Sequence, residues 1–213
     1  MKNLLLSSIF LLLLGACHPG HYGRLNKTPV DSLDYLKRPK PIFGDNFNSF
    51  LFKTNIRVYG HDFSGLLITK QVSPKDYRAI FTTELGMKLF DFEFHDTTFT
   101  LHYCVPQFNR PKLLQVIRKD IELLLMNNIE YTVYDHYYSD PRTSVVFRSA
   151  EGNRFNYYFF EDQTANLVEI EQSSKRAKKV IFTLSEHKDG FPGHILIQHY
   201  DMKLKIELNL LKK

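Results

Sequence analysis

Phe90-Asp91-Phe92-Glu93-Phe94 is the stretch that decides the fold class, because apolar and acidic side chains alternate along it without a break. Successive side chains of a β-strand point to opposite faces of the sheet, so the phenylalanines share one face and the acids share the other. The pattern predicts a half-buried strand. We interpret Asp91 and Glu93 as its solvated outer face; an acid–base pair is the alternative.

Similar alternation continues through most of the chain, most clearly at residues 202–210. Short alternating segments separated by turn residues are typical of an antiparallel meander. The 18 Phe and 12 Tyr also favour strands, since aromatic side chains fit a pleated surface. The predicted strands are 50–59, 63–72, 77–84, 87–94, 99–105, 144–149, 155–161, 167–171, 180–186 and 194–210, the last with a turn or bulge at 200–201.

Residues 111–125 interrupt the β pattern. Their apolar side chains recur at the spacing of one helix face, at positions 113, 114, 117, 121, 124 and 125. Asn109 is a candidate cap, Pro111 suits the first turn, and Asn127-Asn128 is expected to end the helix. The sequence therefore predicts a mainly β domain with minor α structure, in which this helix covers the sheet.

Residues 154–160 are apolar or aromatic at nearly every position. A strand of this composition must be covered on both faces, either by the core and a helix or by the core and a ligand. Residues 131–142 fit neither a helix nor a strand clearly.

The N-terminus predicts an exported lipoprotein. Lys2 precedes an apolar run of about 11 residues, the length of a secretory signal and too short to span a membrane. The run ends in Leu14-Gly15-Ala16-Cys17, which resembles the bacterial lipobox. We predict a signal peptide at 1–16, a lipidated Cys17, a polar tether at 17–45 and one β-rich domain at 46–213. The alternative is an ordinary signal peptide with a coincidental cysteine.

Two further expectations follow from the lipobox. No other stretch is long and apolar enough to cross a membrane, so the anchor is the acyl group alone, with palmitate as one of its fatty acids. His18 stands where an aspartate would retain an enterobacterial lipoprotein in the inner membrane. The resemblance therefore implies the outer membrane, with the domain facing the periplasm.

Motifs that carry chemistry are missing from the sequence. It contains no glycine-rich phosphate loop, zinc-protease helix, Cys-x-x-Cys pair or nucleophile elbow, so we predict no catalytic residue, no cofactor and no metal site. The nine histidines are scattered, and His194 and His199 should face opposite sides of a strand. Cys104 is expected to be a small buried hydrophobe rather than a reactive thiol.

One basic cluster, residues 175–179, lies between two predicted strands. We interpret it as a solvated hairpin tip; contact with anionic lipid head groups is the alternative. Nucleic acid is not an expected partner of an exported lipoprotein, despite the net charge of +5.

Several landmarks together resemble the LolA/LolB-like lipoprotein-carrier superfamily, and LolB-like members above all. They are Phe63-Ser64-Gly65-Leu66-Leu67, the segment 77–86, the amphipathic helix, and the terminal hairpin that starts at Phe191-Pro192-Gly193. The resemblance covers about residues 49–210. It implies a curved antiparallel sheet that forms an unclosed half-barrel, with helices on its concave side and a cavity that accepts acyl chains of lipoproteins.

The resemblance also implies candidate site residues. Leu85 matches a loop that carries an exposed apolar residue in LolB-like proteins, so it is a membrane- or ligand-contact candidate; the alternative is that it tucks under its own hairpin. The sequence departs from the family in having Glu84 where proline is frequent, and no Trp. The candidates for the cavity lining are aromatic residues of two strands: Phe90, Phe92, Phe94, Phe155, Tyr157 and Phe159.

We therefore expect a non-enzymatic, membrane-anchored protein that binds lipids or lipoproteins. Its partners would be membrane lipid, through the N-terminal acyl anchor, and acyl chains of lipoproteins or lipids. The alternative is a structural or assembly lipoprotein of the outer membrane whose packed β-domain binds a protein partner. An exported enzyme is a third reading, which no motif supports.

Overall fold

The computed structural model describes residues 26–27, 41–43, 48–96, 98–126, 135–139, 144–161, 164–175 and 177–213. The predicted signal peptide, Cys17 and most of the tether lie outside these residues. Ile42 and Phe43, which fall in the predicted tether, are buried, and Phe43 packs against Phe50 with ring centroids 4.4 Å apart. The packed body of the protein therefore already includes residues 42 and 43.

The fold is an antiparallel sheet with one helix in the described part of the chain. The elements are β1 (Asn26–Lys27), β2 (Ser49–Val58), β3 (His61–Ser73), β4 (Asp76–Thr82), β5 (Lys88–His95), β6 (Thr98–Cys104), α2 (Pro111–Leu124), β7 (Asp135–Ser139), β8 (Ser144–Glu151), β9 (Arg154–Glu161), β10 (Leu167–Ser174), β11 (Lys178–Ser185), β12 (His194–His199) and β13 (Leu204–Lys212). Most predicted strands are confirmed to within a few residues at either end, and the predicted 194–210 segment turns at Tyr200-Asp201 into the β12–β13 hairpin.

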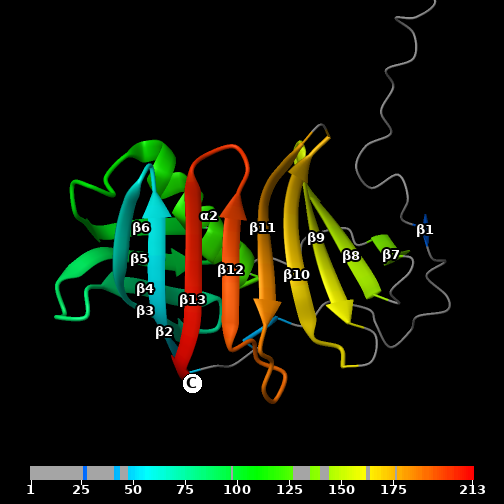
Figure 1. Cartoon of the computed structure of the whole chain (residues 1–213), viewed down its shortest axis with the longest axis horizontal. Helices are drawn as coiled ribbons and strands as arrows, with labels where there is room; N and C mark the ends of the chain where they lie inside the picture. Colours follow the sequence, from blue (N-terminus) through cyan, green and yellow to red (C-terminus); the bar gives the residue numbers. More distant parts are fainter. Residues whose placement is uncertain are drawn as a thin grey trace, which may run out of the picture.

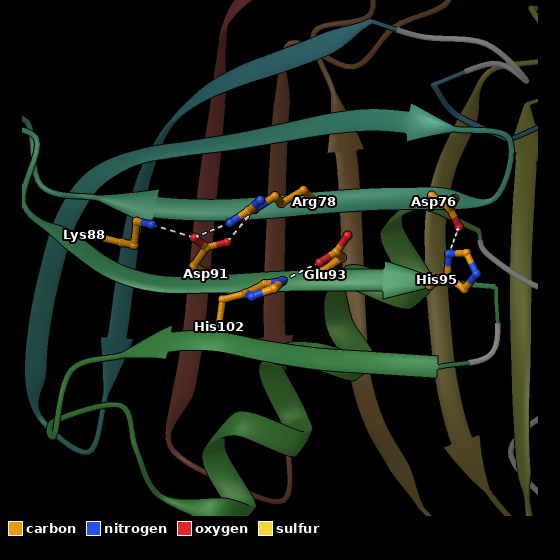
Figure 2. Close-up of polar contacts among 7 residues, drawn as sticks. All are labelled: Asp76, Arg78, Lys88, Asp91, Glu93, His95 and His102. Carbon is orange, nitrogen blue, oxygen red and sulfur yellow. Dashed lines mark hydrogen bonds and ion pairs between the residues drawn. The ribbon is translucent and has the colours of Figure 1, made fainter.

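The 13 strands form one sheet in the order β1-β7-β8-β9-β10-β11-β12-β13-β2-β3-β4-β5-β6. Strand β13 pairs with β2, so the C-terminal strand joins the two halves of the sheet. Strands β1 and β6 lie at opposite ends of the order, and the sheet does not close. The sheet curls: in Figures 1 and 2, β4 and β5 cross β12 and β13 at a steep angle, and α2 lies on the inner side. The predicted unclosed half-barrel is confirmed.

The strand register identifies which side chains face the hollow of the sheet. Paired residues share a face, and two rows of paired, buried apolar residues run across neighbouring strands. One row runs from β9 to β2 through Tyr158, Ile170, Phe182, Ile197, Ile206 and Ile56. The other runs from β5 to β2 through Phe90, Phe81, Leu67 and Phe52. These rows form the floor on which α2 packs.

Helix α2 begins at Pro111, whose missing N–H would have no helical partner there in any case. The residue before it, Arg110, is the N-cap and makes no capping bond through its side chain, so the predicted cap at Asn109 is wrong by one residue. The helix ends at Leu124; the predicted stop at Asn127-Asn128 lies outside the described residues. Among the described residues, no helix is both long and apolar enough to cross a membrane.

Gly65 explains one landmark of the resemblance. A Cβ atom built on this residue of β3 would lie 1.9 Å from the carbonyl oxygen of Thr82, at the end of β4. Only a residue without a side chain permits that approach. The position thus fixes how tightly β3 and β4 can curl together.

Candidate functional site

The face of α2 that meets the sheet is apolar apart from one residue. Leu113, Ile117, Ile121 and Leu124 are each at most 7% exposed and follow the 3–4 residue spacing of a helix face. Leu114, which the sequence also placed on this face, is only half-buried. The helix therefore closes the hollow of the sheet mainly by hydrophobic packing.

A small cavity remains between α2 and the sheet. Its volume is about 20 Å³, which has room for roughly one water molecule. The walls come from α2 and from the neighbouring strands β12, β13, β2, β3, β4 and β5: Thr54, Ile56, Leu67, Phe81, Phe90, Ile117, Asp120, Ile121, Leu124, Ile197, Ile206 and Leu208. Within the described residues, the protein's own side chains leave little open space at this cavity.

Asp120 is the polar exception on the helix face. It is 2% exposed and its Oδ2 lies 2.8 Å from Nε2 of His199, whose side chain is 5% exposed. His199 follows Ile195 and Ile197 at alternate positions of β12, so it points into the hollow. Burial raises the pKa of Asp120 above its ordinary value, and the hydrogen bond with His199 opposes that rise. The pair joins α2 to the sheet at the wall of the cavity.

Sequence reasoning missed this pair, although a signal for each residue was present. Asp120 lies three positions after Ile117 and one before Ile121, inside the apolar stripe. His199 continues the alternation of Ile195 and Ile197. The separation of 79 residues between the partners has no short-range signature.

The phenylalanines of β5 occupy the interior, as their alternation predicted, but they differ in what they touch. Phe90 lines the cavity. Phe92 and Phe94 are buried beside Phe99 of β6, with ring centroids 5.2 Å and 5.5 Å from it, and do not reach the cavity wall. Of this group, Phe90 is the residue that lines the cavity.

The other predicted lining group lies on the wrong face. Phe155, Tyr157 and Phe159 belong to β9, and Tyr157 pairs with Glu171 of β10 rather than with the inward row. Their neighbour Tyr158 is the one that faces the hollow, through its pairing with Ile170. The error arose because β9 is apolar on both faces, so alternation alone could not say which face is inside.

Leu85 is almost fully solvent-exposed, at 98%. It lies at the tip of the β4–β5 hairpin beside Gly86, whose φ of +85° suits the tight turn. Met87 on the same hairpin is 61% exposed. Glu84, the residue before Leu85, forms an ion pair at 3.3 Å with Lys53 of β2. The hairpin therefore presents two apolar side chains to solvent, and Leu85 does not tuck beneath it.

The outer face of β4, β5 and β6 carries a cluster of charges (Figure 2). Asp91 is 1% exposed, so the prediction that it is solvated is wrong. Arg78 makes two hydrogen bonds to it, at 2.8 Å and 2.9 Å, and Lys88 makes one at 2.6 Å. Burial raises the pKa of Asp91, but these cations outweigh it and hold the pKa below its ordinary value. Asp91 is thus a fixed anion rather than a proton donor.

The rest of this face contains two further acid–histidine contacts. Glu93, which is half-buried, contacts His102, and Asp76 lies 2.6 Å from Nδ1 of His95 (Figure 2). No three His, Cys, Asp or Glu side chains in the described residues are grouped so that they could hold a metal ion.

Two other sequence predictions concern single features. Burial raises the pKa of the Cys104 thiol to about 11, which agrees with an unreactive, partly buried cysteine. Of the predicted basic cluster, Lys178 and Lys179 are the partly buried first residues of β11, and Arg176 lies outside the described residues. There Lys178 forms an ion pair with Glu171 at 2.9 Å, and Lys179 forms one with Asp201 at 3.3 Å.

The fold and its interior define a class: an unclosed β half-barrel whose hollow is closed by an amphipathic helix. Among solved structures, it is similar to a domain described as an outer membrane lipoprotein-sorting protein from Vibrio parahaemolyticus, with a TM-score of 0.55 and 12% identity over 79% of this chain and 85% of that chain. It is also similar to a LolA superfamily protein from Nitrosomonas europaea, with a TM-score of 0.52 and 11% identity over 79% of this chain and 87% of that one.

No protein-family model matches the sequence, and no curated protein matches it. At the identities of the two solved structures, the likeness shows the fold and nothing more. The chain shares the half-barrel fold of these two structures, so the fold that the resemblance implied is confirmed.

Proposed function

We propose that the protein binds lipids or lipoproteins by accepting an acyl chain of the ligand in the hollow that α2 covers. The observation that carries the proposal is the apolar interior itself: apart from Thr54 and Asp120, every residue of the cavity wall is hydrophobic. The similar fold of a lipoprotein-sorting domain supports the same class of ligand. No catalytic group is part of the proposal.

The cavity of the closed form is too small for an acyl chain, so binding requires α2 to move. Exposing the four apolar side chains of the helix face would cost about 6–12 kcal/mol, at about 1.5–3 kcal/mol each. Burying ten methylenes of a ligand would return about 8 kcal/mol. The two terms are of similar size, so an acyl chain can replace the helix face without a large penalty.

The test is a displacement assay with a matched pair of variants. A hydrophobic fluorescent probe bound to the protein should be displaced by a fatty acid or a lipopeptide. Ile197→Phe fills the cavity from β12 and should weaken probe binding at least tenfold. The control is Ile181→Phe, the same substitution on the neighbouring strand β11, at a residue that faces away from the hollow. If neither variant nor the unaltered protein shows saturable, displaceable binding, the proposal fails.

We place the site of action at the outer membrane, facing the periplasm, with Cys17 as the lipid-modified anchor. The lipobox-like segment and His18 support this part of the proposal. Cys17→Ala should abolish labelling by fatty acid such as palmitate. Normal labelling of that variant would disprove the anchor, and membrane fractionation tests the location.

The β4–β5 hairpin is the proposed contact with membrane or ligand, because Leu85 and Met87 expose apolar surface at one turn. Leu85→Ser should reduce partition onto lipid vesicles. Val72→Ser is the matched control, since Val72 is also an exposed apolar residue, at 57%, but lies at the β3–β4 end. Equal partition of the two variants would remove the hairpin from the proposal.

A second candidate function is favoured by the small size of the cavity. A half-barrel filled by its own side chains suits a structural or assembly lipoprotein that binds a protein partner. The displacement assay separates the two, because this second function predicts no acyl binding by any variant.

A further inference from the structure

The link between α2 and the sheet is unusual in its chemistry. Every other side chain on the buried helix face could be released from the sheet only by exposing apolar surface to water. Asp120 and His199 are different, because each gains hydration when the helix moves away. A hydrogen bond is also directional and short-ranged, so it is lost after a small displacement.

The buried pair is a poor way to add stability. Taking two ionisable groups out of water costs free energy that their contact only partly returns, and apolar side chains of similar volume often pack at least as well. What the pair does add is a directional contact between α2 and β12, with His199 Nε2 2.8 Å from Asp120 Oδ2. In an open form, both groups are solvated and the cost of opening is lower than for an apolar pair.

We propose that the Asp120–His199 pair is the latch of the cavity: it fixes the closed position of α2 and makes the open position accessible. This inference rests on the proposed function, because the latch controls uptake into the same hollow. The two residues act by positioning the helix and need not touch the ligand.

The test combines hydrogen exchange with probe uptake on the full chain. In the double variant Asp120→Leu/His199→Leu, the latch becomes an apolar contact. The amides of α2 should then exchange at least tenfold more slowly, relative to those of β12 and β13, and probe uptake should slow by a similar factor. Asp120→Asn keeps the size and polarity but weakens the contact. It should speed α2 exchange about tenfold and speed uptake.

A matched control separates the latch from a general effect of polarity in the cavity. Thr54 also lines the cavity and is fully buried, but it belongs to β2 and its hydroxyl bonds to the Phe52 carbonyl. Thr54→Val should leave α2 exchange within twofold of the unaltered protein.

Opposite shifts in the Leu pair and in Asp120→Asn support the latch. The proposal is overturned if, in both variants, the amide exchange rates of α2 change by the same factor as those of β12 and β13. The helix would then open only when the whole domain unfolds. If the Leu pair does not fold, Asp120→Asn decides alone by the same criterion. If the unaltered protein does not bind the probe, the proposed function is wrong. The hydrogen-exchange rates of α2 still test whether the Asp120–His199 pair controls opening of the helix.

Discussion

Two aspartates with almost the same exposure behave in opposite ways. Asp91 on the outer face is 1% exposed and its pKa is lowered, because Arg78 and Lys88 bond to its carboxylate. Asp120 in the interior is 2% exposed and its pKa is raised, because burial outweighs its one contact with His199. The comparison teaches that burial alone does not define a role. Asp91 is a fixed charge that joins β5 to β4 through Arg78, while Asp120 has a single partner in the interior.

The largest expected effect concerns the packing that surrounds the inner pair. Leu124→Ala should lower the free energy of unfolding by about 2–5 kcal/mol, because it leaves a void under the helix. Leu114→Ala, on the half-buried flank of α2, should cost clearly less. Urea unfolding of both variants measures the difference. A loss below about 0.5 kcal/mol for Leu124→Ala, typical of surface positions, would show that the helix is not packed on the sheet.

On the outer face of β4 and β5, the contribution to the free energy of unfolding should come from charge pairing instead of apolar packing. Arg78→Met removes two of the hydrogen bonds to buried Asp91 and should cost about 1.5–3 kcal/mol at neutral pH. Lys88 remains as a partner and limits the loss. The control is Arg57→Met, since Arg57 pairs with Asp62 while both side chains are about two-thirds exposed. That change should stay within about 0.5 kcal/mol. Similar losses for the two variants would break the contrast between buried and exposed pairs.

The pH dependence of stability should have opposite signs at the two aspartates. The ordinary pKa of an aspartate is about 3.9. Because the folded pKa of Asp91 is lowered, its contribution is present above about pH 3.9 and is lost as the pH falls through the folded value. Because the folded pKa of Asp120 is raised, its contribution is present below about pH 3.9 and is lost as the pH rises through the folded value.

The measurement is urea unfolding from about pH 3 to about pH 7 for the unaltered protein, Asp91→Asn and Asp120→Asn. The advantage of the unaltered protein over Asp91→Asn should grow as the pH rises through the lower window. Its advantage over Asp120→Asn should shrink as the pH rises through the upper window. Parallel profiles would contradict the assignment of opposite pKa shifts.

The contrast also marks how far the sequence could lead. Alternation predicted nearly all the strands and the helix because these signals are local. The burial of Asp91 was missed because Arg78, which covers it, lies 13 residues away on another strand. Alternation alone predicts that this face of β5 is exposed to solvent. The Asp120–His199 contact depends on the curl of the sheet, which brings β12 beneath α2 and leaves no local pattern. Tyr157 was misplaced because β9 is apolar on both faces.

The central claim is that the apolar interior under α2 takes up acyl chains. The most direct measurement is lipid extraction and mass spectrometry of the soluble domain purified without detergent, with Ile197→Phe and Ile181→Phe treated in parallel. We predict bound acyl lipid, near one ligand per protein, for the unaltered domain and for Ile181→Phe, and much less for Ile197→Phe. Equal and trace amounts in all three would contradict the claim, and the interior would then serve only as a packed core.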